Sequence, residues 1–361
     1  MRTTMENLAR GYARAGHEVH FIVPENPDTW SRPTSAVVHQ LPSVYVPFSA
    51  GYRVIHRSAA VVSALERIAP DVVEISDRLT LGVAAQWARA AGVHSTVIAH
   101  ERIDGVLASF FPYLPGRALA DTINRRIAAE VDVVVATTAF AAAEFDRIGV
   151  RSVRVPLGVD ATQFGARTTP QIGSGRPQLV MCSRLSREKR PEFALEVLDE
   201  ATRLGREWDL VIAGDGPLRR SMERRARDLP VYFRGFVSDR AELAYLLQSA
   251  DAYLAPGPIE TFGLAALEAL ACGTPVVCNN KSALPEIVGN AGYACALEPK
   301  TWVNAIERML HPSNVDLRSL ARSRAESLPW SVTVAEMLQV HGYDADAEPE
   351  ALAPTRVAKA A

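Results

Sequence analysis

The sequence predicts an α/β fold with a doubly wound parallel sheet in each half of the chain. Short apolar runs typical of buried strands alternate along the chain with longer segments of helical composition. The length of 361 residues suits two domains of ordinary size. A segment rich in glycine and proline, residues 165–177, is the expected linker between them.

The first domain is expected over residues 1–164. Its first helix should end at Gly16, because glycine favours the C-terminus of a helix. The elements that follow alternate as βαβ units require. The expected elements are helix 5–15, strand 18–23, helix 53–68, and strands 71–76, 96–100 and 132–137.

The second domain is expected over residues 178–329. Its predicted strands begin at residues 178, 209, 231 and 251. A helix over 330–343 follows this domain. Residues 344–361 are rich in alanine, glutamate and proline, so we expect a disordered tail there.

Composition excludes several classes of protein. The net charge of −2 argues against a nucleic-acid-binding protein. No apolar run reaches the roughly 18 residues of a membrane span, and no signal peptide opens the sequence. The four cysteines form no CxxC pair, which favours free thiols in a reducing cytoplasm over metal ligands or disulfides.

The segment from Pro258 to Val277 carries the most specific motif, with Glu260 and Glu268 separated by seven residues. Helix formers lie between them, so we expect both carboxylates near one face of a helix. Glu260 would lie at the helix N-terminus, which attracts anions. Gly263 would let a ligand approach the backbone. The alternative is an amphipathic helix with two solvated glutamates.

Two cations lie on the predicted loop after the strand that begins at residue 178. Arg184 and Lys189 precede a helix that starts at Pro191, where proline fits a first turn. This loop would lie at the carboxyl edge of a parallel sheet, where such sheets bind ligands. A planar guanidinium and a mobile ammonium suit a diphosphate. The alternative is an ordinary basic surface loop.

The motifs in their order resemble retaining glycosyltransferases of family 4. Between the two sites lie Gly214-Asp215-Gly216, which lacks the G-x-G-x-x-G spacing of dehydrogenases, and a strand that ends at Val237. The resemblance implies the GT-B fold, in which two Rossmann-like domains face each other across a cleft. It also implies a last helix, 330–343, that crosses back to the first domain.

The resemblance assigns roles to residues of this sequence. It implies that Glu260 orients the donor sugar and that Arg184 and Lys189 neutralise the leaving diphosphate. It implies that His100, at the end of a predicted strand, contacts the sugar; the alternative is an ordinary histidine at the edge of the core. The expected donor-binding residues are Glu268 at the ribose, with Phe262, Gly263, Leu264, Val237, Gly214 and Asp215.

The acceptor side is predicted from fewer features. A loop with exposed-looking aromatic residues contains Tyr52 and Arg53, and Asp77 and Asp104 follow predicted strands. We expect these four residues to bind the acceptor, although Asp77 equally suits capping of the next helix. The loop, with a basic helix over 117–129, would suit a lipid acceptor at an anionic membrane surface.

Segments such as ARGYARAGHEV, EISDRLTLG and AHERID resemble the phosphatidylinositol-mannoside mannosyltransferases that use GDP-mannose. This implies transfer of mannose, with retention, to a glycolipid or other glycan, by a cytoplasmic enzyme or one attached to the inner surface of the cytoplasmic membrane. No metal or cofactor beyond the nucleotide sugar is implied. The alternatives are another donor, such as UDP-glucose, or an inactive nucleotide-sugar-binding remnant.

The remnant hypothesis comes from the start of the sequence. Members of the family begin with an apolar strand and a glycine-rich loop, whereas this sequence begins at the helix after them. The first strand of a doubly wound sheet is central. We therefore expect its position to be unoccupied, which would leave buried backbone groups unpaired at about 1–3 kcal/mol each.

Overall fold

The computed structural model describes residues 2–26, 34–45, 53–110, 113, 115–165, 175–311, 316–343 and 355–361. The chain forms two compact units. One comprises Met1–Leu157 with Trp330–Ala361, and the other Gly158–Pro329. The division therefore falls before the expected linker at 165–177, of which residues 166–174 lie outside the described part.

The first unit is built on a parallel sheet of order β2-β1-β15-β5-β6-β7-β8, and β3 pairs with β4 in a separate antiparallel ribbon. The strands are β1 (Glu18–Pro24), β2 (Val37–Leu41), β3 (Ser43–Tyr45), β4 (Arg53–Ile55), β5 (Val72–Ile75), β6 (His94–Ala99), β7 (Val133–Ala136), β8 (Val153–Arg154) and β15 (Arg356–Ala360). The predicted helix over 53–68 is wrong at its start, because residues 53–55 pair with β3.

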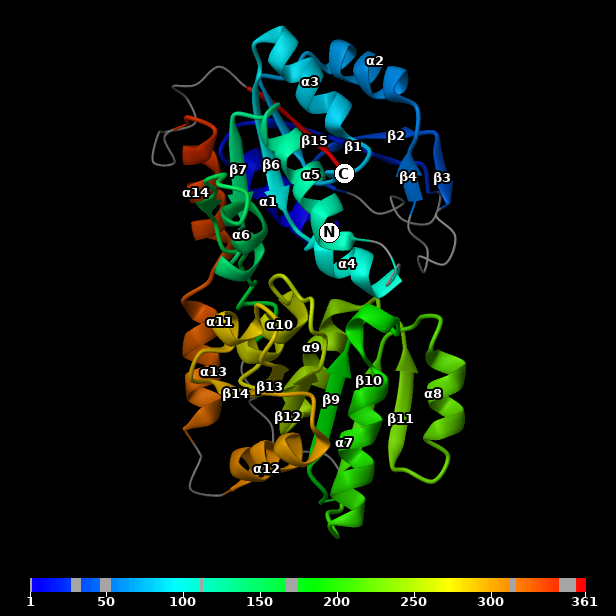
Figure 1. Ribbon diagram of the computed structural model, residues 1–361. Coiled ribbons are helices and arrows are strands. Elements are labelled where there is room, and N and C mark those ends of the chain that lie inside the picture. The colour runs from blue at the N-terminus through cyan, green and yellow to red at the C-terminus, as the bar shows by residue number, and fades with distance from the viewer. Residues whose placement is uncertain are drawn as a thin grey trace. The chain divides into compact units, whose positions relative to one another are not determined.

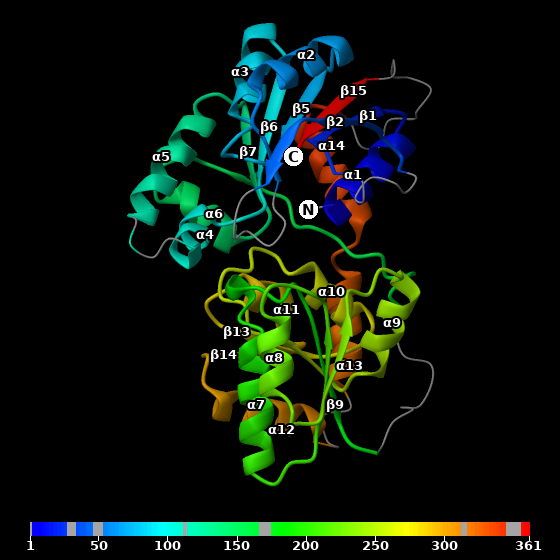
Figure 2. The same ribbon diagram turned by 90° about the vertical axis from the view of Figure 1, so that its right-hand side faces the viewer.

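Helices cover both faces of this sheet (Figures 1 and 2). They are α1 (Arg2–Arg14), α2 (Ser58–Ile68), α3 (Gly82–Ala91), α4 (Ile103–Phe110), α5 (Gly116–Ala128), α6 (Ala139–Asp146) and α14 (Trp330–Val340). One core contains Leu65 of α2 and Phe145 of α6. The other contains Tyr12 of α1 and Met337 of α14. Helix α14 thus contributes to the core of the first unit.

The last residues of the chain form the central strand of the first unit. Strand β15 lies between β1 and β5 and runs parallel to both, and Figure 1 shows it in red. Its residues 357–360 are buried. The prediction of a disordered tail is therefore wrong for residues 355–361, while residues 344–354 lie outside the described part. The central position that we expected to be unoccupied is filled by β15.

A buried cluster of polar groups ties β15 to its surroundings. The Lys359 ammonium donates a hydrogen bond to the Glu74 carboxylate on β5. The Tyr12 hydroxyl and His341 Nε2 contact Glu74 Oε1 at 2.5 and 2.9 Å. Burial by itself raises the pKa of Glu74, but the charge of Lys359 and the His341 hydrogen bond outweigh it and hold this pKa well below its usual range. The cluster joins β15 to β5, α1 and the end of α14.

The second unit contains a parallel sheet of order β11-β10-β9-β12-β13-β14. Its strands are β9 (Gln178–Cys182), β10 (Asp209–Ala213), β11 (Val231–Gly235), β12 (Ala252–Ala255), β13 (Val276–Asn279) and β14 (Gly292–Cys295). Its helices are the 3₁₀-helix η1 (Arg187–Lys189), α7 (Glu192–Arg203), α8 (Arg219–Arg225), α9 (Arg240–Ser249), α10 (Leu264–Ala271), α11 (Leu284–Val288), α12 (Pro299–Leu310) and α13 (Leu317–Glu326).

The strand order of the second unit reverses at β9. From β9 the chain adds β10 and β11 on one side, then crosses to add β12, β13 and β14 on the other. The loops that leave β9 and β12 therefore turn in opposite directions at the carboxyl edge of the sheet. This topological switch point is where open α/β sheets bind ligands.

All four cysteines are free thiols, as predicted, and three of them are buried. Burial raises the pKa of Cys272 and of Cys278 to about 12, so both are protonated and inert at neutral pH. Of the described helices, none has both the length and the apolar composition needed to cross a membrane.

Candidate active site

The loops at the carboxyl edge of the second sheet are joined by backbone hydrogen bonds. Leu185 N donates to Asp215 O at 3.0 Å, and Gly214 N donates to Gly235 O at 2.7 Å. Gly214 has a φ of +140°, and a Cβ there would lie 1.9 Å from the carbonyl oxygen of Ser183. Only glycine allows this approach, so the loop after β10 packs directly against the loop after β9.

Lys189 and Glu260 meet at the switch point. Lys189 ends η1 after β9, and its Nζ lies 2.5 Å from Glu260 Oε2 in the loop after β12. Both side chains are partly exposed, at 29% and 26%. Arg184, on the same loop as Lys189, is exposed. The structure thus brings together three of the four residues expected to be catalytic within one unit.

The peptide between the two glutamates departs from the expected geometry. Helix α10 begins at Leu264, so Glu260 lies on the preceding loop, and the prediction that Glu260 and Glu268 share a helix face is wrong. Gly263 turns the chain into the helix with a φ of +86°, a conformation that favours glycine. As the N-cap it supplies no side-chain acceptor, so the helix N-terminus can receive an anion.

Phe262 is buried, at 3% exposure, and so contributes its backbone, rather than its ring, to this edge. Glu260 is held from behind as well: Ala283 N donates to Glu260 O at 2.9 Å. The loop after β12 is therefore anchored by the buried ring of Phe262 and by the backbone hydrogen bond to Glu260.

Glu268 lies inside the unit and is paired with a residue that the sequence analysis missed. Arg240 Nη2 lies 2.6 Å from Glu268 Oε1. The Glu268 side chain is 8% exposed, and burial raises its pKa while the Arg240 charge opposes that rise. The signal that could have revealed Arg240 is its position at the start of a helix, where a positive charge is unfavourable.

The remaining donor-site predictions occupy the same edge. Asp215 Oδ1 accepts a hydrogen bond from Gly216 N at 2.7 Å, and Oδ2 accepts one from Arg219 at 2.9 Å. Val237 is half-buried just after β11. Its neighbour Phe236, which we did not predict, is 78% exposed, so an aromatic face is available beside the loop.

His100 belongs to the first unit, at the carboxyl end of β6. Burial, together with the positive charge of Lys359, lowers the pKa of His100 to about 3. The imidazole is therefore neutral at physiological pH, so it can donate or accept a hydrogen bond but carries no charge.

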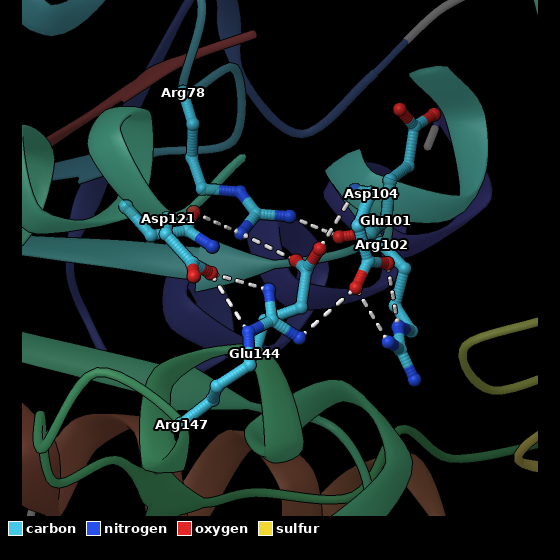
Figure 3. A network of polar contacts seen from close by, with 8 residues as sticks. Arg78, Glu101, Arg102, Asp104, Asp121, Glu144 and Arg147 are labelled. Carbon is cyan, nitrogen blue, oxygen red and sulfur yellow. Dashed lines mark hydrogen bonds and ion pairs between the residues drawn. The ribbon is translucent and has the colours of Figure 1, made fainter. Parts of the chain in front are cut away.

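A polar network holds the loop that follows His100 (Figure 3). The buried Arg78 guanidinium donates to the Glu101 carbonyl oxygen, to Asn124 Oδ1 at 2.7 Å and to Glu144 Oε2 at 3.2 Å. Because Arg78 and Glu144 are both almost fully buried, their pair is rigid and satisfied on several sides. We missed Arg78 because a basic residue after a strand is also typical of a solvated loop.

Two predicted acceptor residues are engaged with the protein itself. Asp104 is bound by Arg102 at 2.7 Å and by Arg147 at 3.0 Å. Although burial raises the pKa of Asp104, its bonds to Arg102 outweigh burial and lower it to about 2. Asp77 accepts hydrogen bonds from the backbone of Leu79 and Thr80.

The bonds of Asp77 form a turn ahead of α3, which begins at Gly82, so Asp77 does not cap that helix. Arg53 is exposed on β4. Tyr52 lies outside the described residues. Of the predicted acceptor residues, Asp77 and Asp104 are thus each engaged by neighbouring groups of the first unit.

Two doubly wound units, one with cations and carboxylates at its switch point, define the GT-B class of glycosyltransferases. Comparison with known proteins agrees. Residues 166–326 match the family model described as glycosyl transferases group 1, and residues 1–158 match a glycosyl transferase 4-like domain. The chain is 42% identical over 356 residues to a GDP-mannose-dependent alpha-(1-6)-phosphatidylinositol dimannoside mannosyltransferase of Mycobacterium tuberculosis, covering 95% of this chain and 92% of that one.

A second relative is the corresponding monomannoside mannosyltransferase of Mycolicibacterium smegmatis, 28% identical over 59% of this chain and 61% of its own length. Among solved structures, a sucrose-phosphate synthase from Thermosynechococcus elongatus superposes with a TM-score of 0.77 at 19% identity, covering 94% of this chain and 92% of that one. A glycosyltransferase from Rickettsia africae gives 0.68 at 13% identity, covering 93% and 94%. These two likenesses show the fold.

The chain belongs to the family of group 1 glycosyltransferases, and it is a glycosyltransferase with the GT-B fold.

Proposed function

We propose that this enzyme transfers mannose from GDP-mannose, with retention of anomeric configuration, to a mannosylated phosphatidylinositol. The observation that carries the proposal is the ion pair of Lys189 with Glu260 at the switch point, with the Arg240–Glu268 pair in the same unit, in a chain similar over almost its whole length to a GDP-mannose-dependent mannosyltransferase. Charged groups of both signs suit a donor that has an anionic diphosphate and two polyhydroxyl rings.

The side chains of the second unit divide the work on the donor. Arg184 and Lys189 would stabilise the negative charge that develops on the leaving diphosphate, the role that preorganised cations serve in a transition state. The unfilled N-terminus of α10 would add backbone N–H donors. Glu260 would orient the hexose, and Glu268 would accept hydrogen bonds from the ribose.

The neutral imidazole of His100 suits a hydrogen bond to the sugar, because a charged histidine would repel the positive charge that develops at the anomeric carbon. The departing phosphate would take the acceptor proton on the face it leaves, which gives retention. No divalent metal is needed in this scheme, since arginine and lysine supply the positive charge.

The proposal is tested by incubating the enzyme with GDP-mannose or UDP-glucose, each with vesicles that contain mannosylated phosphatidylinositol. We expect lipid-linked mannose from GDP-mannose only, at the same rate with EDTA as with magnesium. Glu260→Ala serves as the inactive control. Transfer from UDP-glucose alone would point to the other donor, and a strict magnesium requirement would contradict the charge scheme. If neither donor supports transfer, a nucleotide-sugar-binding remnant is favoured. That alternative was suggested by an expected gap at the centre of the first sheet, and β15 fills this position.

We further propose that the enzyme works as a peripheral protein at an anionic membrane surface. Helix α5 exposes Arg117, Arg125 and Arg126, with Leu119 40% exposed beside them. Tyr113, just ahead of this helix, is 99% exposed. Basic residues near an anionic bilayer contribute about 1 kcal/mol each, and an exposed aromatic ring suits the interface.

Charge reversal at Arg125 and Arg126 should therefore release the protein from vesicles. We expect the double variant to sediment with phosphatidylserine vesicles at least tenfold less than the native protein, since about 2 kcal/mol of attraction is lost. The matched control is Arg203→Glu on α7, which leaves α5 unchanged. Equal binding of all three proteins, or equal binding to neutral vesicles, would refute the surface.

A further inference from the structure

Arg240 occupies an unusual place at the edge of the donor unit. It is the first residue of α9, where the helix dipole disfavours a positive charge. The preceding Asp239 already caps the helix by accepting a hydrogen bond from Ala241 N at 2.8 Å. Arg240 therefore does nothing for the helix to which it belongs. Its contacts lie elsewhere, on two residues distant in sequence.

Those two contacts fix the guanidinium in position. Arg240 Nη2 donates to Glu268 Oε1 at 2.6 Å. The Arg240 Cζ atom also lies 4.6 Å from the centre of the Phe164 ring, and Phe164 is buried at 1% exposure. A guanidinium stacked on an aromatic face and bonded to a carboxylate has little freedom to move. Its side chain is nevertheless 36% exposed, so part of it faces solvent.

Glu268, the partner of Arg240, depends on Arg240 for a balancing positive charge. The other titratable groups that face Glu268 are Cys182, Cys272 and Tyr253, from β9, α10 and β12. Burial raises the pKa of each of these three groups, so all are neutral near pH 7 and none can balance a carboxylate. Arg240 is the described cation that opposes the rise that burial imposes on the pKa of Glu268.

One carboxylate oxygen is left for a ligand. Arg240 holds Oε1, and no hydrogen bond described in the structure uses Oε2 of Glu268. An ionised carboxylate with one oxygen held and one available is suited to accept from a pair of neighbouring hydroxyls. In a nucleoside diphosphate, the ribose 2′ and 3′ hydroxyls are such a pair.

We propose that Arg240 is a positioning residue for nucleotide recognition: it holds one carboxylate oxygen of Glu268 and so orients the other to accept hydrogen bonds from the ribose diol. This inference rests on the proposed function, which places the ribose at Glu268. It predicts a preference for ribonucleotides over nucleotides that lack both hydroxyls. Arg240 would set the strength of that preference without contacting the reacting atoms.

The test measures binding of GDP and of 2′,3′-dideoxy-GDP to the full chain by calorimetry. We expect the native protein to prefer GDP. Arg240→Met should weaken GDP binding roughly tenfold, the value of one charge-assisted hydrogen bond of about 1.5 kcal/mol, and leave dideoxy-GDP binding unchanged. Arg240→Lys keeps the charge but not the planar fork, so its affinity for GDP should lie between those of the native protein and Arg240→Met. Arg203→Met on α7 removes an arginine that pairs with Glu200 of its own helix, and it is the matched control.

Two further readouts separate positioning from a general loss of structure. In Arg240→Met the pKa of Glu268 should rise, because burial is then unopposed, so the preference for GDP over dideoxy-GDP should fall as the pH is lowered from 8 to 6. The native protein should show a smaller fall over that range, because Arg240 opposes the rise in the pKa of Glu268. Donor KM should rise in the variant while kcat changes less than twofold, because ground-state binding is what is lost.

The double variant with Glu268→Gln decides between the possible failures. If Arg240 acts through Glu268, adding Arg240→Met to Glu268→Gln costs no further GDP affinity. Should Glu268→Gln weaken GDP binding while Arg240→Met and Arg240→Lys do not, Arg240 has no positioning role and the ribose assignment stands. Should Glu268→Gln leave GDP binding intact, the ribose assignment in the proposed function is overturned together with the role of Arg240.

Discussion

A chain that lacks residues 356–361 is expected to lose the fold of its first unit while the second unit stays folded. The reason is the central position of β15. Five of its residues are in register with β1 and four with β5, so its removal exposes two strand edges inside the sheet. Each buried N–H or C=O group left unpaired costs about 1–3 kcal/mol. Several such groups exceed the whole stability of a typical domain, about 5–15 kcal/mol.

The loss also unbalances the buried cluster. Without Lys359, Tyr12 and His341 are the partners that the described part of the chain leaves to the fully buried Glu74 carboxylate. Breaking a buried ion pair by removing one partner costs about 3–5 kcal/mol. A point variant, Val357→Asp, should act in the same direction, because Val357 is 0% exposed and would place a second carboxylate in the core.

Calorimetry of the native and shortened chains measures this effect, with GDP present to mark the transition of the second unit. We expect two transitions in the native chain and one in the shortened chain, at the position that GDP shifts upward. Arg356→Ala, at the exposed start of β15, is the control and should change stability by about 1 kcal/mol or less. Two unchanged transitions in the shortened chain would show that β15 is dispensable.

Lys189→Ala and Arg184→Ala are each expected to lower kcat/KM for the donor roughly tenfold to a hundredfold. A charge-assisted hydrogen bond to an anionic group is worth about 1.5–3 kcal/mol. Both residues lie on the loop after β9, at the switch point where the diphosphate is proposed to bind. Lys300→Ala, on the exposed surface of α12, is the matched control.

The ion pair between Lys189 and Glu260 predicts that removing the Glu260 charge strengthens GDP binding. Both side chains are partly exposed, so their pair is worth about 0–1 kcal/mol, and the diphosphate can displace Glu260 from Lys189 at little cost. Glu260→Gln removes the competing carboxylate and should tighten GDP binding, up to about fivefold, while it abolishes transfer. When Glu260→Gln is added to Lys189→Ala, the affinity for GDP should not change further. Weaker GDP binding in Glu260→Gln, or native kinetics in Lys189→Ala, would contradict the assigned phosphate site.

The second unit could be predicted closely because its signals are local. The strands at 178, 209, 231 and 251 are short apolar runs that end in turn residues, and all four are present. Their order along the chain places Lys189 and Glu260 at one edge, as the rule for parallel sheets requires. The sequence could not show that Glu260 precedes α10. Gly263 adopts a left-handed backbone conformation just where the helix formers begin, so the helix starts only after it.

Arg240 and Arg78 escaped prediction for a different reason. Each acts on a residue distant in sequence, Arg240 on Glu268 and Arg78 on Glu144, and composition says nothing about which distant charges meet. The partners of Asp104 were equally unforeseen, since Arg102 and Arg147 both pair with it in the structure.

The sequence by itself determined the α/β class of the fold, since the spacing of apolar runs and glycines reflects the local rules for strands and turns, and the order of its charged motifs carried the resemblance to one family of glycosyltransferases. Only the tertiary structure decided what fills the centre of the first sheet. Residues 356–360 are too short and too rich in alanine and charge to announce a buried strand. They become one because β1 and β5 offer unpaired backbone on both sides and Glu74 offers a partner for Lys359. Those partners lie hundreds of residues away along the chain, where no local pattern can reveal them.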